Sequence, residues 1–183
     1  YELLDLNIGK CRMAVAGMKE VIRNDEYENN YYMFGQNDYF NRPCLCPKCI
    51  EGAKKYISVT TTGEKMIVAL SDTPVGIDGE YLPRYEGKTD YSMLADRFFS
   101  GEEAEYIRAG ATVVDEKDRF MKIWIRKEAF VKCSGKGVAD FPNFSVVDGD
   151  KLLSKVGHTP IRKFSISFPG CEDYIFAIAG ELK

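Results

Sequence analysis

The feature that most constrains the fold is a long amphipathic helix predicted for residues 115–133. Acidic residues lie in its first turn, and Gly135 follows its end as a stop signal. Its apolar stripe consists of Phe120, Ile123, Trp124 and Val131. Such a stripe has to be buried against another layer of the protein. Because segments with strand patterns occupy both flanks of this helix in the chain, we expect an α+β fold.

Strand patterns occur in each half of the chain. In the first half, residues 56–60 and 65–70 are predicted to form a hairpin around a turn at 61–64, and residues 75–81 continue as the third strand of a meander. In the second half, the predicted strands are residues 143–147, 163–168 and 174–179, with Pro169-Gly170 turning between the last two.

Two further segments have helical patterns. Residues 11–23 are predicted to form an amphipathic helix that packs on a sheet. Residues 91–108 have helical character, with Ser100 as the N-cap of a short second helix. Each half therefore offers a helix and about three strands. We divide the chain into an N-terminal half, 1–90, and a C-terminal half, 91–183, which together form one unit.

Composition and charge exclude several classes of protein. The 183 residues suffice to bury a hydrophobic core without a metal or disulfides. The net charge of −3 argues against a nucleic-acid-binding protein, since affinity for the phosphate backbone requires clustered Lys and Arg. No apolar run approaches the roughly 20 residues of a membrane span, so we expect no membrane association and a cytoplasmic location. The six cysteines are expected to be reduced.

Two carboxylates in the third predicted strand are the first candidates for a site. Asp78 and Glu80 are two residues apart, so on a strand their side chains point to the same face, about 7 Å apart. Carboxylates this close repel each other unless a cation lies between them, and Mg²⁺ prefers such oxygen ligands. The alternative is a solvated edge strand that carries two acids.

Glu128 is a further candidate, because the helical pattern places its carboxylate inside the apolar stripe, one turn after Trp124. A buried charge needs a partner. Lys132 lies one turn further on the same face, and Lys127 flanks Glu128 at a different angle. The group is either an ordinary Glu–Lys pair at the border of the stripe or a site for phosphate bound to Mg²⁺.

Three segments, taken in their order and spacing, resemble the 4'-phosphopantetheinyl transferase superfamily. They are Val75-Gly76-Ile77-Asp78-Gly79-Glu80, then Arg97-Phe98-Phe99-Ser100 with Glu103, and finally Trp124-Ile125-Arg126-Lys127-Glu128-Ala129-Phe130-Val131-Lys132 with Gly135-Lys136-Gly137. The match is to the larger, single-chain type typified by the surfactin-synthetase-activating enzyme, and it extends over roughly residues 56–179.

The resemblance implies two similar α+β halves related by a pseudo-twofold axis, with coenzyme A in the cleft between them. It implies that Asp78, Glu80 and Glu128 hold Mg²⁺ beside coenzyme A, while Lys132, helped by Lys127, contacts the phosphates. Glu128 would take the proton of a serine hydroxyl on an acyl or peptidyl carrier protein. The serine then receives the phosphopantetheine arm as 3',5'-ADP leaves. A monomer is expected, because the two halves already form both walls of the cleft.

The sequence departs from the family pattern in its first half. Where the family usually has Ser-His-Ser-Gly, this chain has Thr60-Thr61-Thr62-Gly63. Thr61 replaces a histidine that helps to hold the 3'-phosphate of coenzyme A, and the hydroxyls of Thr60 and Thr61 remain as candidates for that contact. Asn41-Arg42-Pro43 is similar to the family's Gly-Arg-Pro, which implies that Arg42 lies near the adenine or its phosphate. The N-terminal half is expected to be trimmed.

Other interpretations stay open at this point. Cys44, Cys46 and Cys49 have a spacing suited to zinc but lack a fourth ligand nearby, so the alternatives are a loop with thiols or a zinc or redox module. A second alternative is that this chain is a catalytically inactive scaffold, which keeps the fold and binds coenzyme A or a carrier protein without transferring the arm. The small trimeric holo-acyl-carrier-protein synthases perform the same chemistry with a half-length chain, and the length and two-half pattern of this sequence argue against that type. The sequence does not distinguish fatty-acid, polyketide and peptide synthesis.

Overall fold

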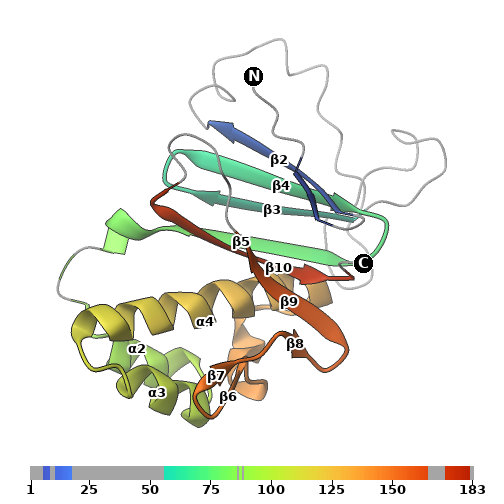
Figure 1. Ribbon diagram of the computed structural model, residues 1–183. Coiled ribbons are helices and arrows are strands. Elements are labelled where there is room, and N and C mark those ends of the chain that lie inside the picture. Colours follow the sequence, from blue (N-terminus) through green and yellow to red (C-terminus); the bar gives the residue numbers. More distant parts are fainter. Residues whose placement is uncertain are drawn as a thin grey trace.

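The structure is a computed structural model that describes residues 6–8, 11–17, 56–85, 87, 89–164 and 172–181. Within these residues the fold is α+β: two four-stranded antiparallel sheets lie next to each other, and helices cover the second of them (Figure 1). The strand order is β1-β2-β4-β3 in the first sheet and β5-β10-β9-β8 in the second. The edge strands β3 and β5 are neighbours, so the two sheets meet along them.

The first sheet confirms the predicted hairpin. Its strands are β1 (Leu6–Ile8), β2 (Cys11–Gly17), β3 (Tyr56–Thr62) and β4 (Lys65–Ser71). β3 and β4 pair along their whole length, and Gly63 turns between them with a φ of +56°, which a residue with a side chain rarely adopts.

The helix predicted for residues 11–23 is wrong where the structure describes it. Residues 11–17 form β2, which pairs with β4 along its whole length and with β1 on its other side. Apolar residues fill nearly every position of this short segment. The periodicity of so short an apolar run does not separate a strand from a helix, and here the pairing with β4 decides.

The second sheet combines one strand of the first half with strands of the second. It contains β5 (Val75–Tyr81), β10 (Tyr174–Gly180), β9 (Thr159–Phe164) and β8 (Lys155–Val156). The strands predicted at 75–81 and 174–179 are confirmed. The strand predicted at 163–168 begins earlier, at Thr159, and its second part lies outside the described residues, as does the predicted Pro169-Gly170 turn. β5 does not continue the meander, because it leaves the first sheet and pairs with β10.

The strand predicted for residues 143–147 is wrong for most of its length. The elements found here are the 3₁₀ helix η3 (Val138–Asn143) and the short strands β6 (Val147–Asp148) and β7 (Lys151–Leu152). Side chains occupy backbone groups that a strand would have used. Lys127 donates to the carbonyl oxygen of Phe144, and Glu103 accepts from the N–H of Val146. The segment is therefore tied to α3 and α4 before it enters the short pair of β6 and β7.

The described helices after β5 are α2 (Tyr91–Phe98), α3 (Gly101–Arg108) and α4 (Val113–Ser134). The helical character of residues 91–108 is confirmed as two helices, and Ser100 caps the second, with Glu103 completing a capping box. α4 confirms the predicted long helix and begins two residues earlier. Gly135 ends it with a φ of +77°. None of these described helices is both long and apolar enough to cross a membrane.

The contact between α4 and β5 is unusually close. The core lies between the helices and the second sheet, and its centre is an aromatic cluster formed by Phe99, Phe120, Trp124 and Phe141. A Cβ atom at Gly76 of β5 would lie 1.9 Å from the carbonyl oxygen of Ala129 and 2.4 Å from the backbone nitrogen of Cys133. Glycine therefore lets the two backbones touch, which sets the separation between the elements that carry the predicted site residues.

Candidate active site

Asp78 of β5 and Lys132 of α4 meet where the strand and the helix face each other. Lys132 Nζ donates to Asp78 Oδ1 over a distance of 2.7 Å. The Lys132 side chain is 31% exposed and that of Asp78 only 7%, so the lysine reaches inward from the surface. The contact joins two of the segments on which the family resemblance rests, although they are 54 residues apart in sequence.

Asp78 is buried more deeply than an ionised carboxylate usually is. Its Oδ1 also accepts from Thr60 Oγ1 at 3.1 Å, but its Oδ2 is buried without a hydrogen-bond partner among the described residues. Burial raises the pKa of Asp78 to about 7; Lys132 opposes the rise, and the charges of Glu128 and Glu80 add to it. Such a carboxylate favours the binding of a proton or a metal cation.

Glu80 extends the same row of side chains along β5. Its Oε2 accepts from Thr62 Oγ1 at 3.2 Å. Tyr85 lies beside Glu80. Burial, together with a hydrogen bond to Glu80, raises the pKa of the Tyr85 phenol above its ordinary value. Tyr85 was not a candidate from the sequence, since its contact with Glu80 depends on the turn η2 (Leu82–Tyr85) that follows β5.

Glu128 lies one turn before Lys132 on α4 and is partly buried. Burial raises the pKa of its carboxyl; Lys132 opposes the rise, and the charge of Glu80 adds to it. The charges of Asp78, Glu80 and Glu128 therefore act on one another, and we call these three residues the carboxylate cluster.

The donor chemistry of the carboxylate cluster fits a hard cation such as Mg²⁺. The cluster offers only oxygen ligands, includes the buried, unpartnered Oδ2 of Asp78, and couples three negative charges. Within the described ranges, no three His, Cys, Asp or Glu side chains are drawn together closely enough to form a metal site. Lys132 supplies the positive charge at Asp78 instead. Asp78, Glu80 and Glu128 are the residues of this site that offer the oxygen ligands such an ion prefers.

Threonines of β3 hold the carboxylates of β5. Thr60 donates to Asp78 and Thr62 donates to Glu80. The two threonines are two residues apart on β3, and the two carboxylates are two residues apart on β5, so the two contacts lie side by side. The structure thereby gives Thr60 a partner inside the protein, and Thr62, which the sequence had not singled out, has the equivalent contact. Thr61 points to the other face of β3 and is exposed, so it is the one of the three that is open to a ligand.

A row of hydroxyl groups, which we define as Ser58, Thr60 and Thr62, also joins the two sheets. The N–H of Ile77 donates to Ser58 Oγ, and the N–H of Tyr81 donates to Thr62 Oγ1, both at 2.9 Å. Because β3 and β5 are edge strands of separate sheets, these side chains stand where a backbone ladder would otherwise connect them. The spacing of two residues between the three hydroxyls was the sequence signal for this row.

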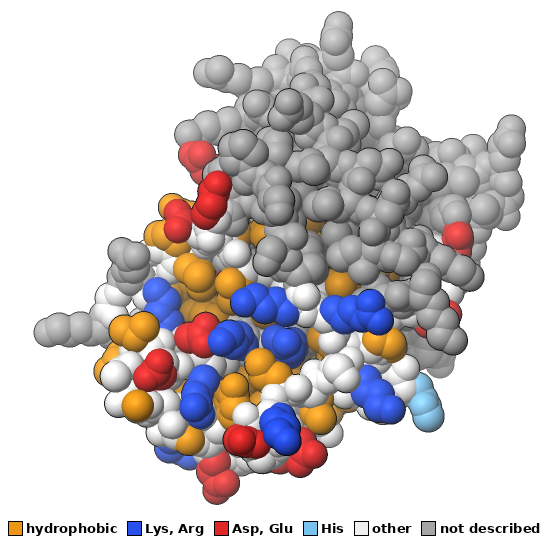
Figure 2. All heavy atoms as spheres, in the orientation of Figure 1, with side chains coloured by type: hydrophobic (Ala, Val, Ile, Leu, Met, Phe, Trp, Pro, Cys, Tyr) orange, Lys and Arg blue, Asp and Glu red, His pale blue; other side chains and the backbone are white. Residues whose placement is uncertain are grey.

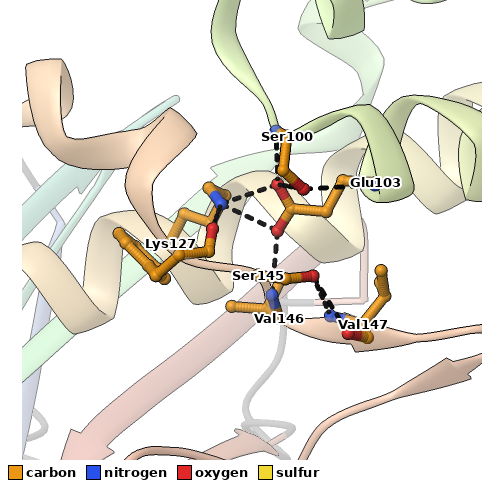
Figure 3. A network of polar contacts seen from close by, with 7 residues as sticks. Ser100, Glu103, Lys127, Ser145, Val146 and Val147 are labelled. Carbon is orange, nitrogen blue, oxygen red and sulfur yellow. Dashed lines mark hydrogen bonds and ion pairs between the residues drawn. The ribbon is translucent and has the colours of Figure 1, made fainter.

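Lys127, which the resemblance places near the phosphates, lies elsewhere in the structure. Its side chain has no exposed area and forms an ion pair with Glu103 (Figure 3). Burial lowers the pKa of Lys127, and the negative charge of Glu103 opposes that change. The structure therefore places Lys127 in a network between α3 and α4 and does not bring it to the carboxylate cluster.

Several candidates cannot be placed, because Arg42 and the cysteines at 44, 46 and 49 lie outside the described residues. On the face shown in Figure 2, basic side chains gather in the middle of the described part, and acidic side chains lie mainly towards its edges. A local excess of basic groups attracts anionic ligands even on a protein whose net charge is −3.

Comparison with known families agrees with the resemblance. A family model described as the 4'-phosphopantetheinyl transferase superfamily matches residues 74–179, more than half of the chain. The matched segment begins just before β5, contains α4 and ends within β10. It therefore includes all members of the carboxylate cluster and Lys132.

Individual relatives bear the same description. The chain is 33% identical to the 4'-phosphopantetheinyl transferase psf-1 of Bacillus pumilus over 107 residues, which are 58% of this chain and 42% of that protein. It is 30% identical to the 4'-phosphopantetheinyl transferase Sfp of Bacillus subtilis over 128 residues, 69% of this chain and 52% of that protein. With HetI of a Nostoc species it shares 35% identity over 74 residues, 39% of this chain and 29% of that protein. The chain spans about half the length of these relatives or less.

Proposed function

We propose, because the chain belongs to the 4'-phosphopantetheinyl transferase superfamily, that it transfers the 4'-phosphopantetheine group of coenzyme A to a serine of an acyl or peptidyl carrier protein. The second product is 3',5'-ADP. The observation that best supports this is the contact of Lys132 with Asp78, beside the charges of Glu80 and Glu128. Such a group offers negative charge for a cation and positive charge for a phosphate within one site.

Asp78, Glu80 and Glu128 would hold Mg²⁺. When bound, the ion would supply positive charge at the pyrophosphate of coenzyme A, where negative charge develops as the bond to the leaving group breaks. The unpartnered Oδ2 of Asp78 supports this assignment, because a buried oxygen without a donor gains from a cation beside it. Thr60 and Thr62 would keep two of the carboxylates in place.

Lys132 would bind the phosphates of coenzyme A. Nearly a third of its side chain is exposed, so its ammonium group reaches both the buried Asp78 and the surface. When Asp78 turns to other ligands, the ammonium group is released to contact a phosphate oxygen. Its charge then stabilises the departing 3',5'-ADP.

Glu128 would act as the general base. Burial raises the pKa of its carboxyl, which brings it closer to the range in which a base removes a proton from a hydroxyl at neutral pH. As the serine proton passes to Glu128, the serine oxygen forms a bond to the phosphorus that carries the pantetheine arm. The bond from that phosphorus to the 3',5'-ADP oxygen breaks, and the arm remains on the carrier.

Coenzyme A would lie between the two halves of the chain, 1–90 and 91–183, related by a pseudo-twofold axis. The boundary falls in the connection between β5 and α2, so Asp78 and Glu80 would come from the first half and Glu128 from the second. Thr61, which is exposed on β3, and Arg42 would contact the 3'-phosphate and adenine ends. We place the reaction in the cytoplasm and assign it to a monomer.

Mass spectrometry of an apo carrier protein tests the proposal after incubation with this protein, coenzyme A and Mg²⁺. We expect the carrier to gain the mass of one phosphopantetheine group, and to gain nothing when the metal is chelated or when Glu128→Gln removes the base. Glu105→Gln changes an exposed acid on α3 and is the matched control that should transfer normally. Binding of coenzyme A without transfer to any acyl or peptidyl carrier would refute the transferase and favour a scaffold that binds without reaction.

A further inference from the structure

Lys127 and Glu103 form a buried ion pair in which the ammonium group and both carboxylate oxygens have hydrogen-bond partners (Figure 3). Lys127 Nζ lies 2.7 Å from each carboxylate oxygen of Glu103 and 2.5 Å from the carbonyl oxygen of Phe144. Glu103 also accepts from the N–H and the hydroxyl of Ser100 and from the N–H of Val146. Neither charged side chain has any exposed area, so the network needs no water to complete it.

Three aromatic rings surround the ammonium group. Lys127 Nζ lies 4.1 Å from the ring centroid of Phe144 and 5.7 Å from those of Phe99 and Phe141. The rings attract the cation and keep water away from it. In these surroundings the ammonium group has one preferred position, because a displacement loses hydrogen bonds that water cannot replace.

The ion pair ties together three parts of the fold that are far apart in sequence: α3, α4 and the segment before β6. Its hydrogen bonds span 24, 17 and 43 residues. A buried ion pair seldom adds net stability relative to apolar side chains of similar size. Its specific effect is on position, because a rotated or shifted α4 would not bring Lys127 to all of its acceptors.

The position of α4 matters because Lys127 is the immediate neighbour of Glu128. Successive residues lie about 100° apart around a helix, so Lys127 can face α3 while the next residue, and Lys132 one turn later, face β5. The backbone contact at Gly76 limits how closely the helix approaches β5. A rotation of about 10° would move a side-chain atom about 6 Å from the helix axis by about 1 Å.

We propose that the Glu103–Lys127 ion pair is a positioning device, which sets the rotation of α4 so that Glu128 and Lys132 point towards Asp78. Lys127 then supports the reaction without contacting coenzyme A. The kinetic consequence rests on the proposed function, whereas the structural consequence concerns only the placement of α4.

A neutral pair of side chains tests this proposal. Glu103→Gln combined with Lys127→Met keeps similar shapes and removes both charges, so no unpaired charge is left buried. We expect the double variant to fold and to lose on the order of 100-fold in kcat, the loss that follows a displacement of about 1 Å at reacting groups. The matched control is Ile107→Ala, which removes a fully buried side chain from α3 and leaves both charges of the pair in place. It should keep its kcat at temperatures where it is folded.

Two measurements separate position from stability. In a protein that already carries Glu128→Asp, the neutral pair should cause much less than its full loss of kcat, because both changes displace the same carboxylate. A crystal structure of the neutral pair should show that the contact of Lys132 with Asp78, 2.7 Å in the wild type, is lost. Two results would overturn the proposal. One is a loss of kcat in the variant with all three changes that equals the product of the losses caused by Glu128→Asp and by the neutral pair. The other is a structure of the neutral pair in which Lys132 still contacts Asp78.

The crystallographic result does not depend on activity. If the wild type modified no carrier, the proposed function would fail, and the structure of the neutral pair would still decide whether the ion pair positions α4. If the wild type and the neutral pair modified carriers equally fast, the positioning proposal alone would fail.

Discussion

Replacing Gly76 by alanine would test whether the direct contact between β5 and α4 places the site. The added Cβ would lie 1.9 Å from the carbonyl oxygen of Ala129 and 2.4 Å from the backbone nitrogen of Cys133. Both are main-chain atoms, so no side-chain rotation relieves the clash. To lengthen the shorter contact from 1.9 to 3.0 Å, α4 has to retreat by about 1.1 Å.

That retreat has two consequences of calculable size. Overpacking of a well-packed interface destabilises a protein by about 1 to 3 kcal/mol, and we expect the upper end because backbone has to move. The contact between Lys132 and Asp78, now 2.7 Å, would lengthen beyond hydrogen-bond distance. A displacement of about 1 Å at reacting groups lowers a rate by about 100-fold.

Urea unfolding measures the first consequence, and kcat for carrier modification measures the second. Gly101→Ala is the matched control, because a Cβ at that position of α3 meets nothing within 4 Å. It should be as stable as the wild type or more stable by about 0.4 to 1 kcal/mol. The reasoning would be refuted if Gly76→Ala unfolded within about 0.5 kcal/mol of the wild type and kept its kcat.

Folding raises the pKa of Asp78 from 3.8 to about 7, so the native protein holds its proton to higher pH than the unfolded chain. In the metal-free protein the unfolding free energy should therefore fall as the pH rises from about 4 to about 7, and urea titrations of Asp78→Asn should lack that slope; an identical slope would contradict the assignment. At pH 8, Mg²⁺ should raise the Tm of the wild type in thermal unfolding but not that of Asp78→Asn, and equal shifts would place the ion elsewhere. Thr60→Val should lower the unfolding free energy by about 1 kcal/mol because it removes the hydrogen bond to Asp78. Thr61→Val, at the exposed neighbour, should change it by less than about 0.5 kcal/mol, and similar effects of the two would argue against the hydroxyl row.

The sequence predicted the elements that carry the site because their signals are local. β5 lies at residues 75–81 as predicted, and α4 ends at the predicted glycine. The helical spacing also placed Glu128 and Lys132 one turn apart. The contact of Lys132 with Asp78 depends on how α4 packs on β5, so it became visible only in the structure.

Errors arose where distant residues decide a local conformation. The segment before β6 has the composition of a strand, but Lys127 and Glu103 bind its backbone groups from two helices. The sequence also did not indicate that the Lys127 side chain turns towards α3, because its acceptor there, Glu103, is 24 residues away in the chain. Likewise, β5 follows the hairpin directly in the chain, yet its backbone pairs with β10, almost 100 residues later.

The hydroxyl of Thr62 has a single proton, and the main chain of β5 determines its direction. The N–H of Tyr81 can only donate, so it occupies a lone pair of Thr62 Oγ1. The proton of that hydroxyl points at Oε2 of Glu80. Serine at position 62 would preserve both hydrogen bonds of the hydroxyl. Valine would keep the shape of the side chain but would lose the hydrogen bond to Glu80. The orientation of one hydrogen bond to the carboxylate cluster is thus fixed by a neighbouring peptide group, whichever ligand is bound.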